Sequence, residues 1–195
     1  MKRFISIVLL ILSVAVIGCS GGSKNEVEEY ITALKKGDFQ TLYEMNSTAQ
    51  RKAALIYRRG EEAGKEDAMK KNFEENKALF DNAQADGVYG NQWTEKFLFP
   101  PDSKHTIDKV TVARDTERPT AGAFKDIKVC SAEVSVEYPN KETAPPIEDK
   151  KVKSAKYTML FISGENVVMG LKSKKAVNPW LFKSITVKTG EVTYW

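Results

Sequence analysis

The sequence predicts an α+β domain in which N-terminal helices pack on a curved antiparallel β-sheet. Between about residues 25 and 84, apolar residues recur with the period of an α-helix. From about residue 110 onward the period becomes two, which is typical of half-buried strands. A run of helices followed by a run of strands favours helices gathered on one face of an antiparallel sheet. The sequence shows no internal repeat and no boundary to a second domain, so we expect one domain over 25–195.

Local signals place the ends of the helices. Asn25 is expected to cap the first helix, because it precedes several glutamates that favour the positive end of the helix dipole. Gly37 is expected to end that helix, and Asp38 to cap a second, short one. A third helix is predicted over 48–58 and a longer fourth helix over 61–84.

The strands follow from apolar residues at alternate positions. Over 127–138 the inward parity slips once at Val129-Cys130, which predicts a β-bulge. The strand over 157–162 is apolar on both faces, so we expect it to be central in the sheet. Further strands are predicted around 110–112 and over 167–171, 180–187 and 192–195, and loops over 100–106, 116–124 and 139–149.

The first residues carry the pattern of a secretion signal. Lys2 and Arg3 precede an apolar run over 4–18, which is shorter than the ~20 residues that span a bilayer. The run ends in Val16-Ile17-Gly18-Cys19, which resembles the lipobox of bacterial lipoproteins. In that family the signal peptide is removed before the cysteine, and the cysteine receives acyl chains such as palmitate.

The lipobox resemblance implies three segments and a location. Residues 1–18 would be the signal peptide, and residues 19–24 a flexible tether that begins with lipidated Cys19. Two or more acyl chains hold a protein stably on a membrane, so the membrane is an expected partner. The implied location is the cell envelope. Ser20 implies the outer membrane, facing the periplasm, where the bacterium has two membranes.

Charge and cysteine usage narrow the functional classes. Removing residues 1–18 takes away Lys2 and Arg3 and lowers the net charge from +4 to +2, which gives no case for a nucleic-acid partner. Lipidation would consume one of the two cysteines and leave Cys130 without a disulfide partner. Because Cys130 is flanked by apolar residues on a predicted strand, we interpret it as a small buried hydrophobe rather than a nucleophile.

A second resemblance concerns the globular part. The segments over 25–43 and 178–185 resemble the opening helices and the closing strand of NTF2-like, cystatin-like envelope domains. This resemblance implies the same order of helices first and a curved antiparallel sheet after.

Few residues suggest chemistry. His105 is the only histidine, and Asp108 could orient it for acid–base catalysis. The alternative, which we favour, is that His105 is solvated in the loop after Pro100-Pro101. One histidine and one remaining cysteine give no metal site, and no glycine-rich phosphate loop is present, so no cofactor is expected.

Two further patterns leave alternatives open. The segment 88–101 is rich in aromatic residues, which could line a ligand pocket or join the helices to the sheet, and packing is the favoured interpretation: Tyr89, Trp93, Phe97 and Phe99. Lysines in 150–156 and 172–175 alternate with apolar residues. They indicate a solvated sheet face or, as a second possibility, a patch for anionic headgroups.

The expected function is therefore a non-catalytic, membrane-anchored envelope protein that binds a partner protein or a small ligand. One alternative is a hydrolase or isomerase that uses a pocket with His105 and Asp108. Another is a structural or assembly accessory of an envelope complex.

Overall fold

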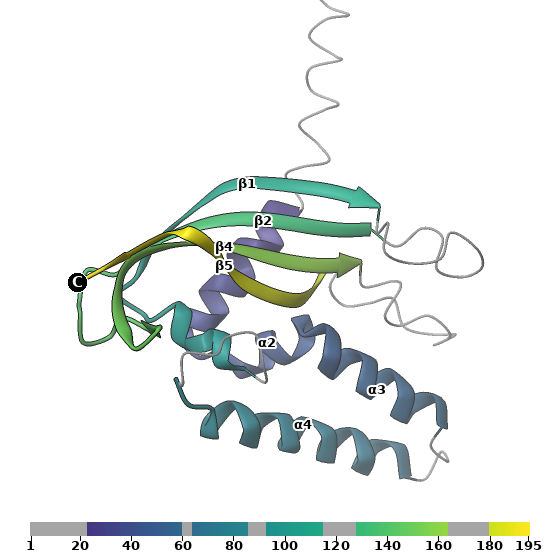
Figure 1. The fold of residues 1–195 in the computed structure, drawn as a ribbon. Coiled ribbons are helices and arrows are strands. Elements are labelled where there is room, and N and C mark those ends of the chain that lie inside the picture. Colours follow the sequence, from purple (N-terminus) through teal and green to yellow (C-terminus); the bar gives the residue numbers. More distant parts are fainter. Residues whose placement is uncertain (1–22, 60–63, 86–92, 115–127, 164–179) are drawn as a thin grey trace, which may run out of the picture.

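The structure is a computed structural model of the chain, and it describes residues 23–59, 64–85, 93–114, 128–163 and 180–195. In these ranges, helices and antiparallel strands follow one another in the predicted order. The helices lie together on one side of the sheet (Figure 1), which confirms the α+β prediction. None of the helices in these ranges is long and apolar enough to cross a membrane.

The first helix is described over residues 23–36, and it ends where the sequence predicts. Gly37 adopts φ 66°, a left-handed conformation that glycine reaches without steric penalty. The amide of Gly37 donates to the carbonyl of Leu34 at 3.2 Å, and the amide of Asp38 donates to that of Ala33 at 2.9 Å. These two bonds satisfy carbonyls that the end of a helix otherwise leaves open.

The predicted beginning of this helix is wrong. Ser23 and Lys24 are already helical, so Asn25 is not the N-cap and the predicted tether over 19–24 is too long. Ser23 is buried beside Cys130, to whose thiol its side chain is hydrogen-bonded. This tertiary contact accounts for the earlier start, which the apolar period alone does not reveal.

Three more helices complete the helical half. Helix α2 (Phe39–Met45) is capped by Asp38 as predicted, since its carboxylate accepts from the amide of Thr41 at 3.3 Å. Helix α3 (Ser47–Arg59) confirms the third predicted helix, and α4 (Lys65–Asn82) lies within the fourth. A 2.8 Å ion pair between Lys52 and Glu75 joins α3 to α4.

The strands form one antiparallel sheet in which β4 (Lys150–Ser163) is central, as predicted. It pairs with β2 (Lys128–Glu137) along one edge and with β5 (Trp180–Tyr194) along the other. Strand β1 (Lys104–Arg114) pairs with β2, and the short β3 (Pro146–Ile147) pairs with the start of β4. The loop predicted over 116–124 and the strand predicted over 167–171 lie outside the described residues.

The β-bulge predicted at Val129-Cys130 is not found. The pairing of β2 with β4 runs without a break from Val129 to Glu137. Val129 is a half-exposed apolar residue near the end of its strand, and it imitates a slip in the inward pattern. The register shifts instead in β1, between Ile107 and Lys109, and at three places between β4 and β5. The last two predicted strands are one continuous strand, β5.

Tyr30 joins the first helix to the sheet and to the short segment around Glu95 that precedes the first strand. Its ring stacks on Phe182 of β5 with a centroid distance of 4.4 Å and meets Phe161 of β4 edge-on at 5.8 Å. Its hydroxyl donates to Glu95 Oε1 at 2.9 Å. Glu95 lies in the short 3-10 helix η2 (Thr94–Leu98) and is only 2% exposed.

Burial sets the ionisation of this pair. It raises the pKa of Glu95 above its ordinary value, and the hydrogen bonds to the carboxyl from the backbone of Glu95 itself and from Tyr30 only partly oppose the shift. It also raises the pKa of Tyr30, and the nearby carboxyl adds to this effect.

Because the hydrophobic cluster spans Val27 to Ile185, the chain over 20–195 carries the whole described core.

The first prediction concerns the Tyr30 hydroxyl. In the chain over 20–195, Tyr30→Phe keeps the ring but removes the hydroxyl that donates to the buried Glu95 carboxyl, and this should lower the free energy of unfolding by roughly 1–3 kcal/mol. Urea unfolding followed by circular dichroism measures the change. Tyr194→Phe, on a half-buried ring of β5, is the control and should cost less than about 0.5 kcal/mol. Equal costs for the two variants would show that the bond contributes nothing.

The second prediction concerns pH. The folded state binds the Glu95 proton more tightly than the unfolded state does, because burial raises the pKa from 4.5. Wild-type stability should therefore fall as the pH rises from the ordinary value through the raised one, and the penalty should stay constant above it. Glu95→Gln, which cannot ionise, should gain stability relative to wild type over that window. A difference that stays constant from about pH 4 to pH 8 would contradict the burial argument.

Candidate functional site

The structure does not bring His105 and Asp108 together. Strand β1 begins at Lys104, so His105 lies in a strand and not in the expected loop. Its Nε2 lies 3.0 Å from Oε1 of Glu28 in the first helix, on the face that this helix covers. Asp108 instead accepts from Ser135 Oγ at 2.6 Å. Ser135 alternates with inward-facing valines on β2, so Asp108 lies on the outer face of the sheet.

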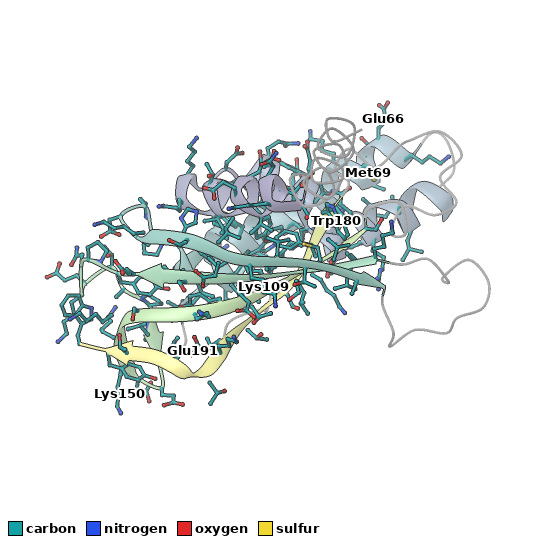
Figure 2. The ribbon with its side chains drawn as sticks, turned by 90° about the horizontal axis from the view of Figure 1, so that it is seen from above. Glu66, Met69, Lys109, Lys150, Trp180 and Glu191 are labelled. Atoms are coloured by element: carbon teal, nitrogen blue, oxygen red, sulfur yellow. The ribbon has the colours of Figure 1, made fainter. Side chains whose placement is uncertain are left out.

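The outer face of the sheet carries balanced charges. Lys156 lies 3.2 Å from Glu191 and 3.5 Å from Asp108, and Lys188 lies 3.3 Å from Glu133. Figure 2 labels Glu66 and Met69 in α4, and it shows Glu191 and Lys150 on the part of the sheet remote from that helix. These pairs agree with a solvated sheet face for Lys156. The lysines of 172–175 lie outside the described residues.

Cys130 is a buried hydrophobe, as predicted. Its side chain is fully inaccessible, and burial raises the pKa of its thiol to about 11. A thiol with this pKa holds almost no thiolate at neutral pH, and the thiolate is the nucleophilic form. Within the described ranges, no group of three or more histidine, cysteine or acidic residues could hold a metal ion.

The aromatic segment serves the core, and part of it also lines a cavity. Trp93 is 3% exposed and packs on the rings of Phe39 and Phe80, with centroids 5.4 and 6.0 Å away. Phe99 is fully buried, and Phe97 is half-buried. Phe97 and Phe99 both line the cavity described next. Phe99 therefore both packs in the core and forms part of the cavity wall. Tyr89 lies outside the described residues.

The cavity has a volume of about 570 Å³ and lies at the C-terminal end of the first helix. Residues 34–37, the segment 96–101 and the loop over 142–146 enclose it. Its floor is apolar and largely buried: Leu34, Phe80, Phe97, Phe99 and Ala144, with prolines from both loops. Its rim is cationic: Lys35, Lys36, Lys96 and Lys151. Glu142 is the one acidic residue among the described residues that line it.

Two proline-containing loops line the cavity. Each contributes an adjacent pair of prolines, whose fixed φ angles limit the motion of the chain. The two loops are tied together, because Thr143 Oγ1 donates to the carboxylate of Asp102 at 2.9 Å. Ser103 closes the first loop with bonds from its amide and its hydroxyl to the carbonyl of Pro100, at 3.0 and 2.7 Å. The cavity walls are therefore held without any ligand.

Three of the lysines are positioned by main-chain carbonyls. Lys35 Nζ donates to the carbonyl of Ser103 at 2.6 Å, and Lys151 Nζ to that of Ala144 at 2.8 Å. Lys96 Nζ donates to the carbonyl of Phe80 and lies 4.6 Å from the centroid of that ring. Burial lowers the pKa of Lys96, and Asp81 partly opposes this shift. A carbonyl orients an ammonium group but does not neutralise its charge, so the rim stays positive.

Sequence reasoning found part of this site. The sequence predicts Phe97 and Phe99 as candidate pocket residues, and Lys151 belongs to the lysine-rich segment over 150–156. Lys35, Lys36 and Lys96 were missed, because only the fold brings these residues near Lys151. The remaining signal in the sequence is the two proline pairs, which predict loops but no site.

Comparison of the chain with protein-family models, curated proteins and solved structures found no match. The geometry of the cavity is therefore the basis for its interpretation.

Proposed function

We propose that this chain is a bacterial envelope lipoprotein, anchored through acyl chains on Cys19, whose globular part binds a small ligand without transforming it. The observation that carries the ligand-binding part is the cavity with a buried apolar floor and a rim of lysines. Its volume of about 570 Å³ falls in the range of small-molecule sites, which are mostly apolar with a few polar groups that orient the ligand.

The position of the cavity suits an anchored protein. The first helix over 23–36, at ~1.5 Å per residue, is about 20 Å long. The cavity is at its C-terminal end, whereas Cys19 precedes its N-terminal end in the sequence. The few residues from Cys19 to Ser23 reach roughly 14 Å at most. The anchor and the cavity therefore belong to opposite ends of the helix, which supports a cavity that faces the aqueous side.

Binding is better supported than catalysis. His105 and Asp108 lie on opposite faces of the sheet, and neither lines the cavity. The buried thiol of Cys130 is no nucleophile at neutral pH. The described residues that line the cavity offer ammonium groups hydrogen-bonded to carbonyls and one exposed carboxylate, an arrangement suited to holding a ligand.

The anchor is tested by Cys19→Ala in the full chain. This change removes the sulfur that would carry the lipid, so labelling with a fatty-acid analogue and retention in the membrane fraction should both be lost. Ser20→Ala, which leaves the Val16–Cys19 block intact, is the control and should keep both. Unchanged labelling and fractionation of the C19A chain would contradict the anchor.

The cavity is tested with Nile red, a neutral apolar dye that fluoresces strongly when it leaves water. The chain over 20–195 should bind it saturably at one site. Thr143→Trp places an indole at the exposed rim and should weaken binding at least tenfold. Thr111→Trp, on exposed β1, is the matched control and should bind like wild type. Absence of saturable binding, or equal binding by the two variants, would contradict the proposed function.

A further inference from the structure

Resting on that proposed function, we infer that the ligand of the cavity is an amphiphile with a single anionic head group on an aliphatic or aromatic body, taken up from solution. The apolar floor would bury the body, and the lysine rim would hold the head group. The head-group chemistry is that of a carboxylate, a phosphate monoester or a sulfate.

The floor requires an apolar body. Leu34, Phe99 and Ala144 are nearly or fully buried, yet all three line the cavity. Polar partners for a fully hydrophilic ligand are therefore missing at the bottom of the site among the described residues. Each methylene of an aliphatic body that leaves water there adds to the binding free energy through the hydrophobic effect.

The rim requires an anionic head. Four lysines and one glutamate line the cavity, so its lining carries a formal excess of positive charge. An ammonium group has three N–H donors, and Lys35 and Lys96 each use one on a carbonyl. The remaining donors can bind an anion without breaking the bonds that position the side chains. Such charge-assisted hydrogen bonds are about twice as strong as neutral ones.

The same charges argue against other head groups. An alkylammonium head would meet like charges on Lys36 and Lys151, and Glu142 is the one acidic side chain among the described lining residues with which it could pair. An alcohol head could accept one hydrogen bond but would leave the excess charge uncompensated. The rim therefore discriminates by charge, while the floor discriminates only by apolar area.

The source of the ligand follows from the two ends of the first helix. The cavity is at the end opposite Cys19, so an anchored chain does not press it against the bilayer that holds the anchor. We therefore expect the site to take single molecules from the aqueous compartment rather than headgroups that remain in that bilayer.

The test is competition with Nile red on the chain over 20–195. Three probes share a twelve-carbon chain and differ only in the head: dodecanoate, dodecan-1-ol and dodecylamine, each below its aggregation concentration. Dodecanoate should displace the dye at a concentration at least tenfold lower than dodecanol, and dodecylamine should be the weakest. Raising the salt concentration should narrow the gap between dodecanoate and dodecanol, because salt screens exposed charges.

Substitutions assign the charge preference to the rim. Lys36→Gln and Lys151→Gln should each weaken dodecanoate binding several-fold more than they weaken the binding of Nile red or dodecanol. Lys36 is exposed, so its substitution spares the core. Glu142→Gln should strengthen dodecanoate. Lys150→Gln is the matched control, because Lys150 lies over the Tyr194 ring at 5.5 Å, does not line the cavity, and should have no effect.

The outcomes separate this inference from the function on which it rests. Equal competition by dodecanoate and dodecanol, with Nile red still blocked by T143W, would overturn the anionic head and leave ligand binding intact. Absence of a T143W-sensitive Nile red site would overturn both. Sedimentation of the chain with vesicles that contain an anionic phospholipid, abolished by K36Q, would show that the head group comes from a bilayer and would overturn uptake from solution.

Discussion

The hydrogen bond from Tyr30 to Glu95 is the interaction on which the rest of the structure depends. It joins the first helix to η2 within an aromatic stack that includes one residue from each of the two longest strands, Phe161 and Phe182. Burying a carboxyl is costly, and the cost is tolerated only because the carboxyl has a donor. A helix that shifted along the sheet would lose both the stack and the donor, so the pair fixes one position of the helix.

The same pair positions the cavity. Lys35 follows Tyr30 by little more than one helical turn, and Lys96 is the neighbour of Glu95. Fixing Tyr30 against Glu95 therefore places two of the rim lysines on adjoining walls of the cavity. The carbonyls of Ser103 and Phe80 then orient their ammonium groups. The proline loops complete the walls, so the site is preorganised and a ligand would lose little free energy in ordering it.

The sequence is most informative where structure is local. The α+β class, the end of the first helix at Gly37 and the cap at Asp38 follow from period and cap chemistry, and all are confirmed. The inclusion of Ser23 in the first helix and the place of His105 in a strand accompany tertiary contacts: Ser23 is buried beside Cys130, and His105 pairs with Val136 of β2. Neither contact leaves a trace in the local pattern, so both predictions failed.

The candidate site divides in the same way. Its aromatic floor could be anticipated from a dense run of aromatic residues, because such runs are buried in most folds. Its rim could not, since the four lysines lie on three segments, which become neighbours only when the first helix, η2 and the start of β4 meet.

The most direct test of the central claim is a two-dimensional NMR titration of the chain over 20–195 with dodecanoate. The account predicts that shift changes concentrate at residues 34–37, 96–101 and 142–146 and include the lysine side chains. Changes confined to the outer sheet face, or none at saturating dodecanoate, would contradict it.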